Sequence, residues 1–500
     1  MKFETKVTLT EQEIESGLKS IIKDGLASQT MVTLTSGVFL VAFALKLGAS
    51  NTIIGLLAAI PPLMQLIQIP SIYLVEKIRN RRAITVYTAA LSRIFWLFIA
   101  LIPFLFSGEL GLSVLIIVLF LISAFGAVSA SSWNSWMRDL IPQERLGAFF
   151  SKRMRLATGL GIILSFAAGY YIDYWKKYFP NYELHSYSIL FTLGLLAGMI
   201  GIYFISTIPE PRMVPIQEKL NLFKLMMQPF RNVNFKNLII FMGSWNFAVN
   251  LAAPFLTVYM LKRLQLDMFL IIAFSMLSQL ISFLFFRIWG KFSDRYSNKS
   301  VLGVNGPLFM LCILAWTFTT MPEKYVLTIP LLIIIHIFMG ISTAGVTLAS
   351  GNIGLKLAPK GQATAYLATN SLINSLAAGI APIFGGKLAD FFAGRELSMS
   401  LKWISPDTEF IIPTLNIRQW DFFFVLAFFI GTYSIHRLAM VKEEGEVEEK
   451  IIIHELLSEV TRPLRNISTA GGLRFMINFP FSILRHSRQF FFKNSRPGGD

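Results

Sequence analysis

Residues 290–299 read Gly-Lys-Phe-Ser-Asp-Arg-Tyr-Ser-Asn-Lys, and residues 76–82 read Glu-Lys-Ile-Arg-Asn-Arg-Arg. Both stretches place an acidic residue and several basic residues in a short polar turn between long apolar segments. Glu76 and Asp294 lie 218 positions apart, which is close to half of the 500-residue chain. A turn of the same character at this spacing predicts a duplicated bundle of membrane helices.

The composition supports a membrane location. The chain has 54% hydrophobic and only 15% charged residues, which is too apolar for an ordinary soluble enzyme. Apolar stretches of about 20 residues, enough to cross a hydrocarbon core of about 30 Å, recur along the sequence, and we count about twelve. Their expected ranges are 26–46, 52–75, 83–106, 111–136, 146–172, 186–208, 237–261, 267–289, 300–320, 328–350, 363–388 and 419–438.

The net charge of +16 is concentrated in alternate loops. Lys and Arg cluster after the even-numbered spans, as at Lys77 to Arg82 and Lys291 to Lys299, and are scarce in the opposite loops. Because basic loops stay on the cytoplasmic side during insertion, both termini are expected in the cytoplasm and the protein in the cell membrane, with no nucleic-acid partner. The single cysteine, Cys312, falls in the ninth span and excludes an internal disulfide framework.

The expected organisation has five parts. Residues 1–25 form a cytoplasmic amphipathic segment, in which Thr10 and Glu13 make a capping-box signature. A disordered tail is the alternative for this segment. Residues 26–208 form the first six-helix half, 209–236 a central cytoplasmic loop, 237–438 the second half, and 439–500 a basic cytoplasmic tail.

Matching residues support the duplication. Five residues of the first half have an identical counterpart 217 positions later, and the matches fall at corresponding ends of corresponding spans. The pairs are Leu140 and Leu357, Pro142 and Pro359, Ala148 and Ala365, Gly169 and Gly386, and Asp173 and Asp390.

With Gly290, Asp294, Arg295 and Lys299 in the turn between the eighth and ninth spans, the chain resembles the major facilitator superfamily. The first copy departs from the family motif, with Ile72 in place of glycine, Glu76 in place of aspartate and Lys77 in place of arginine. The resemblance covers roughly residues 26–438. It implies an all-α membrane protein of twelve helices, in two pseudo-symmetric halves that rock about a central cavity.

The two turns are candidate conformational latches, because charge-assisted contacts at helix ends can hold one state and part in the other. The alternative is that these residues only fix the topology through the positive-inside rule. The candidate latch residues are Glu76, Lys77, Arg81, Gly290, Asp294, Arg295 and Lys299.

Arg93 lies near the middle of the third span, where a charge is costly unless it is paired or hydrated. Asp24 is a candidate partner, which makes the pair structural or part of ion coupling. An anionic substrate is the other candidate, and Arg93 therefore also counts as a candidate substrate-binding residue. His336, in the tenth span, can carry a proton near neutral pH, although a lone buried histidine is more often only hydrogen-bonded.

Side-chain amides recur at helical spacing within the spans. Residues three or four apart share one face of a helix, and a polar face inside lipid is expected to point into the bundle. These amides can bind a substrate or a neighbouring helix. The candidate substrate-binding amides are Asn246, Asn250, Gln279, Asn370 and Asn374, and Gln65 with Gln68 follows the same pattern.

No enzyme signature is complete. His454-Glu455 lacks the second histidine of a zinc-binding helix, and no phosphate-binding lysine loop appears, so we expect no catalysis, cofactor or metal. The sequence predicts a monomeric secondary transporter for a small solute, driven by an H⁺, Na⁺ or solute gradient. Arg93 favours an organic anion and the tryptophans a hydrophobic compound. The alternatives are a lipid flippase or scramblase on the same fold, and a membrane scaffold or sensor that binds partners through residues 391–420 and the tail.

Overall fold

The computed structural model describes residues 5–213, 227–320, 324–359, 363–405, 408–448 and 450–456. Within them, twelve helical segments are long and apolar enough to cross a membrane, which confirms the predicted twelve spans. The first half contains α1 (Glu11–Thr35), α2 (Val38–Lys46), α3 (Asn51–Met64), η1 (Gln65–Ile67), α4 (Gln68–Ile78), α5 (Arg81–Leu105), α6 (Gly108–Leu140), α7 (Gln143–Tyr178), η2 (Pro180–Tyr182) and α8 (Glu183–Thr207). The second half contains η3 (Gln228–Arg231), α10 (Val233–Lys262), α11 (Met268–Arg295), α12 (Asn298–Ala315), η4 (Trp316–Thr319), α13 (Thr328–Leu357), α14 (Ala363–Phe391) and α15 (Trp420–Ala439).

Two spans of the first half are interrupted for local reasons. The first breaks between α1 and α2 at Gly37, whose φ of 62° is a backbone conformation that favours glycine. The second changes to the tight η1 turn directly after Pro61 and Pro62, which cannot donate hydrogen bonds to the preceding turn of α3. The chain therefore bends beside the region where the two halves meet.

The expected separate helix over residues 1–25 is instead the first part of α1, which runs without a break from Glu11 to Thr35. The Thr10 and Glu13 capping box is present, as the sequence predicts. The apolar stripe of this helix does not lie free on a surface. Leu18 and Ile21 are buried in a small core with Trp136 and Leu140 of α6, so packing against the bundle makes the segment continuous with the first span.

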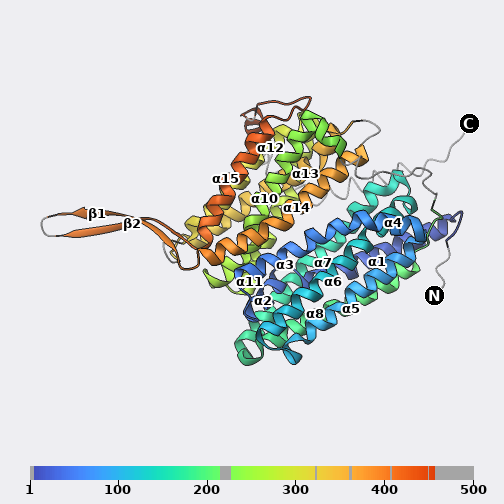
Figure 1. Cartoon of the computed structure of the whole chain (residues 1–500), viewed down its shortest axis with the longest axis horizontal. Helices are drawn as coiled ribbons and strands as arrows, with labels where there is room; N and C mark the ends of the chain where they lie inside the picture. The colour runs from blue at the N-terminus through green and yellow to red at the C-terminus, as the bar shows by residue number, and fades with distance from the viewer. Residues whose placement is uncertain are drawn as a thin grey trace, which may run out of the picture.

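The two halves meet along α3 and α14 and along α7 and α11 (Figure 1). Small residues make the first contact close. A Cβ atom added at Gly55 would lie 2.1 Å from the carbonyl oxygen of Pro382, and one added at Gly386 would lie 2.4 Å from that of Asn51. In the contact between α7 and α11, Gly169 is the counterpart of Gly386. A Cβ atom added at Gly169 would lie 2.5 Å from Ile272. The small residues of α14 and α7 therefore let helices of the two halves pack closely.

A β-hairpin projects from the body between α14 and α15 (Figure 1). Its strands β1 (Glu396–Ile404) and β2 (Glu409–Arg418) pair antiparallel, with Leu397 opposite Ile417 and Trp403 opposite Phe410. The whole of β1 is exposed, including the alternate residues Leu397, Met399, Leu401 and Trp403. The sequence predicted only a loop here. We call the end of the bundle that carries this hairpin the hairpin end, and the opposite end, where α1 begins, the termini end (Figure 1).

Candidate functional site

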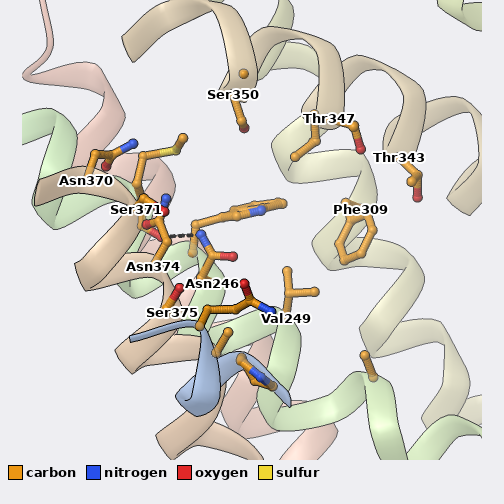
Figure 2. A pocket seen from close by; sticks show the side chains of 18 of the residues that line it. Asn246, Val249, Phe309, Thr343, Thr347, Ser350, Asn370, Ser371, Asn374 and Ser375 are labelled. Atoms are coloured by element: carbon orange, nitrogen blue, oxygen red, sulfur yellow. Dashed lines mark hydrogen bonds between the residues drawn. The ribbon is translucent and has the colours of Figure 1, made fainter. Parts of the chain in front are cut away.

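A cavity of about 700 Å³ lies between the two halves (Figure 2). It is formed by α3 and η1 of the first half and by α10, α12, α13 and α14 of the second. Along α14 its lining residues run from Leu367 to Ala378, and the next residue, Gly379, packs against Ala59 and Leu63 of α3. The cavity therefore begins where the seam between α3 and α14 ends, on the side nearer the termini. Its lining residues are Pro62, Gln65, Met242, Trp245, Asn246, Val249, Ala253, Leu256, Phe309, Ile313, Met339, Thr343, Val346, Thr347, Ser350, Gly351, Leu367, Asn370, Ser371, Asn374, Ser375 and Ala378.

The described lining residues carry no charge. Polar side chains come from α13 and α14, and aromatic side chains come from α10 and α12. Hydroxyl groups of α13 face amides and hydroxyl groups of α14, as the labelled side chains in Figure 2 show. Trp245 and Phe309 pack together with ring centroids 5.5 Å apart and form the aromatic wall. Among the described residues that line the cavity, none carries an ionisable side chain.

Three polar atoms of this lining are buried without a hydrogen-bond partner among the described residues: Ser350 Oγ, Asn370 Oδ1 and Asn374 Oδ1. Asn370 as a whole is only 7% exposed. Buried polar atoms in native proteins nearly always have a partner, since an unsatisfied one costs about 1–3 kcal/mol. Their position around one cavity makes them candidate contacts for a bound solute.

The structure brings together three of the predicted substrate-binding amides, Asn246, Asn370 and Asn374, with Gln65 from the opposite half. Two others lie elsewhere. Asn250 donates its Nδ2 hydrogen to the carbonyl oxygen of Asn246, 2.8 Å away, and does not line the cavity. Gln279 is exposed on α11 and is also absent from the lining, whereas its neighbour Ser278 faces α13 and donates to the carbonyl oxygen of His336 at 2.8 Å.

Arg93 lies within the first half, away from the cavity lining. Its guanidinium is 3.5 Å from Asp24, donates to Ser28 Oγ at 2.9 Å and also bonds the carbonyl oxygen of Gly198. A Cβ atom at Gly201 would lie 2.5 Å from the guanidinium, so small residues of α8 make room for it. The two residues are the ion pair that the sequence offered as one alternative.

Two carboxylates join the halves at the hairpin end. Asp390, at the end of α14, accepts the backbone N–H groups of Asn51 and Thr52 at 3.1 and 2.8 Å, and both of their side chains at 2.8 and 2.6 Å. Asp173, at the end of α7, accepts the backbone N–H groups of Met268 and Phe269 at 3.0 and 2.8 Å. Each carboxylate therefore caps the first turn of a helix from the other half, where the helix dipole favours a negative charge. We call Asp173 and Asp390 the paired clamps.

The paired clamps follow the internal repeat on both sides of the contact. Asp173 and Asp390 differ by 217 positions, and so do Asn51 and Met268, whose N–H groups they bind. The sequence identified the aspartates as matching residues but gave them no role, because their partners lie on distant helices.

Arg81 is completely buried and organises the termini end of the first half. It forms ion pairs with Asp139 at the end of α6 and with Glu210, whose Oε1 lies 3.4 Å from its Nε. Glu210 also accepts the backbone N–H groups of Arg81 and Arg82 at 2.7 and 3.1 Å, so it caps α5. These contacts stay within one half.

The second half repeats this arrangement, but its cation lies on a different helix. Glu443, only 5% exposed, accepts the backbone N–H of Lys299 at 2.7 Å and the Asn298 side chain at 2.9 Å, and lies 3.0 Å from the ammonium group of Lys356. Asn298 and Lys356 correspond to Arg81 and Asp139 at the 217-residue offset. The cation therefore sits on α13 in this half and on α5 in the other.

Glu210 and Glu443 are site residues that sequence reasoning missed. Both follow the sixth helix of their half, but they lie 233 positions apart and so break the 217-residue pattern. An acidic residue just after each sixth helix, facing a basic helix start, is the signal that could have found them.

Two of the remaining candidate latch residues, Lys299 and Arg295, form ion pairs with described residues. Lys299 also binds Glu446 at 2.7 Å, and Arg295 pairs with Glu455 of the C-terminal segment. Tyr296 donates to the same Glu455, which raises the pKa of the tyrosine.

The other charged latch residues, Glu76, Lys77 and Asp294, form no ion pair with another described residue in this state. Glu76 is half-buried, and its backbone carbonyl oxygen accepts a hydrogen bond from Arg79 Nε. Asp294 and Lys77 are exposed, and a Cβ atom at Gly290 would make only ordinary contact with Leu348.

His336 is buried among apolar groups. Its Nδ1 atom lies 2.8 Å from the carbonyl oxygen of Leu332, and its ring stacks on Phe274 with centroids 5.0 Å apart. No carboxylate among the described residues bonds it.

Comparison with known proteins identifies the family. The model of the Major Facilitator Superfamily matches residues 25–382. The chain belongs to the major facilitator superfamily. It is thus a membrane transporter by family, and no curated protein matches it in sequence.

Solved structures of superfamily transporters share the fold. The nucleoside transporter NupG, in a mutant form, aligns with a TM-score of 0.62 at 14% identity, covering 86% of this chain and 100% of that one. A bacterial homologue of the iron transporter ferroportin, described as inward-facing, aligns at 0.59 and 12%, covering 87% and 100%. A bacterial homologue of the lysosomal transporter Spinster, inward-facing and unoccupied, aligns at 0.56 and 15%, covering 77% and 84%. At these identities the likeness establishes the superfamily fold and leaves the substrate to the site itself.

Proposed function

We propose that this protein is a secondary transporter that carries a small solute by alternating access, and that the structure corresponds to its inward-open state. The observation that carries the proposal is the combination of the paired clamps with the cavity. The clamps and the glycine seam close the hairpin end, while the cavity begins on the termini side of that seam. A solute in the cavity can leave toward one side only.

The direction of opening follows from the charge distribution. Basic turns between spans lie at the termini end, and the positive-inside rule places such turns in the cytoplasm. The candidate latch residues Glu76 and Asp294 are at this end, and neither forms an ion pair with another described residue in this state. We infer that they make their contacts when the termini end closes, so that each state is held by its own set of charged residues.

The driving force is an ion or solute gradient, with H⁺ and Na⁺ as the ions to test. The lipid flippase and scaffold alternatives are less favoured, because hydroxyl and amide groups concentrate in a cavity between the halves. NupG is described as a nucleoside transporter, which makes uridine a reasonable first solute.

The test is a cross-link across the hairpin end. Lys176 and Asp267 belong to α7 and α11, lie 3.9 Å apart and are exposed, so cysteines there replace only a weak surface pair. Lys176→Cys with Asp267→Cys in a Cys312→Ser background is joined with a bifunctional thiol reagent, and uptake of labelled uridine, glucose and charged metabolites is measured in proteoliposomes under H⁺ and Na⁺ gradients.

Uptake of at least one solute that stops on cross-linking and returns on cleavage of the linker supports the proposal. Full uptake by the cross-linked protein refutes alternating access. Uptake that ignores every gradient and requires ATP refutes secondary transport, and no uptake of any solute favours the scaffold.

A further inference from the structure

We propose that the cavity selects an uncharged solute that carries hydroxyl, amide or ring N–H groups along one edge and an apolar face on the other. This inference rests on the proposed transport function and assigns the chemical class of its substrate. It uses the lining of the cavity and the position of the nearest buried charges.

The absence of ionisable groups from the described lining decides the charge of the solute. Moving an ion from water into a site of low dielectric constant costs several kcal/mol unless an opposite charge or many hydrogen bonds compensate it. The buried cation that could have received an anion, Arg93, is engaged by Asp24, Ser28 and Gly198 within the first half. The organic anion that Arg93 favoured in the sequence therefore has no binding partner in this cavity.

The polar edge is set by Ser350, Asn370 and Asn374. Their buried oxygen atoms lack partners, and each side chain can both donate and accept. Asn246 adds little here, because its Nδ2 group already donates to the carbonyl oxygen of Met242 at 2.8 Å. Ser350 lies on α13, and Asn370 and Asn374 lie on α14, so a solute with polar groups toward both helices would satisfy these oxygens, whereas a purely apolar compound would leave them unsatisfied.

The apolar face is set by the aromatic wall that α10 and α12 contribute. Trp245 and Phe309 present their packed rings to the cavity, and a flat or ring-shaped solute can lie against them. The volume of about 700 Å³ lies within the range of roughly 300–1,000 Å³ that small-molecule pockets occupy. Most of the contacts belong to the second half, so that half holds the solute while the first half supplies Gln65 and the closing surface.

The test measures thermal unfolding of the purified full chain with neutral solutes and their charged derivatives. The probes are uridine against uridine 5′-monophosphate, and glucose against glucose 6-phosphate and glucosamine. A ligand that prefers the folded state raises the melting temperature. An uncharged probe is expected to raise it, and the charged twin of that probe is not.

Variants locate the binding. Asn374→Ala and Ser350→Ala are each expected to weaken the uncharged probe about tenfold, the effect of one lost hydrogen bond to a buried group. Asn352→Ala is the matched control, since Asn352 lies on α13 two residues from Ser350 but lines a separate surface pocket. Asn374→Asp preserves the side-chain shape and is expected to shift preference from glucose to glucosamine, which keeps the test decisive if an alanine variant unfolds.

A charged probe that stabilises the wild-type protein as strongly as its neutral twin overturns the inference, and so does the failure of both neutral probes to bind. Equal loss in Asn352→Ala and Asn374→Ala also overturns it. Transport of a charged solute would refute this inference and leave the transport function intact. Binding of a neutral probe without any transport would refute the function and leave the binding class intact.

Discussion

Neutralising one of the paired clamps, by Asp390→Asn, is expected to open the hairpin end. Asp390 accepts four hydrogen bonds from Asn51 and Thr52, and its charge lies at the start of α3. An asparagine keeps the shape but turns an NH₂ group toward part of these donors. The charge–dipole interaction is worth about 0.5–2 kcal/mol and each hydrogen bond to a charged group about 1.5–3 kcal/mol.

A conservative total is a loss of about 2–3 kcal/mol from the state with the hairpin end closed. The ratio of closed to open molecules then falls roughly 30- to 150-fold, at about 1.4 kcal/mol for each factor of ten. Spin labels at Glu109→Cys and Lys324→Cys, both exposed and one in each half, report the separation by double electron–electron resonance in a Cys312→Ser background. The variant is expected to populate a longer distance.

Asp267→Asn is the matched control. Asp267 is also an aspartate at the start of a helix, but its side chain is 75% exposed and caps no backbone group of α11. It should leave the distance distribution unchanged. A distribution in Asp390→Asn that matches both wild type and this control would refute the reasoning that the clamp holds the closed state.

Three further predictions concern other parts of the molecule. Arg93→Ala leaves the Asp24 charge buried without its main partner and should lower the free energy of unfolding by about 3–5 kcal/mol, measured by chemical denaturation in detergent, whereas the double change of both residues to leucine should recover most of it. Gly386→Ala forces a Cβ atom against a backbone carbonyl and should open the hairpin end at a cost of about 1–3 kcal/mol, seen with the same spin labels, while Gly159→Ala meets nothing within 4 Å and should not. A hydrogen bond from its lysine partner lowers the pKa of Glu446, so its stabilisation is complete above the ordinary value near about 4.3 and is lost as the pH falls through the lowered value. Glu446→Gln should therefore make the fall of the melting temperature in acid less steep.

Each of these predictions has a contrary outcome. Unchanged stability of Arg93→Ala would mean that the buried pair contributes no net stabilisation. Equal behaviour of the two glycine variants would mean that the seam can move apart at no cost. An unchanged acid profile in Glu446→Gln would mean that this ion pair does not contribute to folding.

The sequence predicts the spans and the halves well because both depend on local physics. A run of about 20 apolar residues must form a helix in lipid, and the loop charges determine topology. The same holds for the capping box at Thr10 and for close packing near Gly386, where small residues carry the signal themselves.

Features that depend on distant partners were predicted less well. The amides Asn246 and Gln279 both looked suitable for the cavity, but only Asn246 lines it, because the rotation of each helix is set by its neighbours. Asp173 was visible as a repeat but not as a cap, since its acceptor role needs the first turn of α11. The hairpin was missed although Leu397 to Trp403 alternate as a strand does, because two strands become stable only together.

Glu210 and Glu443 have a consequence for how the chain is built. Each follows the sixth helix of its half and accepts a backbone N–H group at the start of the third helix of the same half. Cutting the polypeptide between residues 213 and 227 would leave both contacts whole. Each half therefore fixes the start of its own third helix, and the alternating access proposed above would leave these contacts intact.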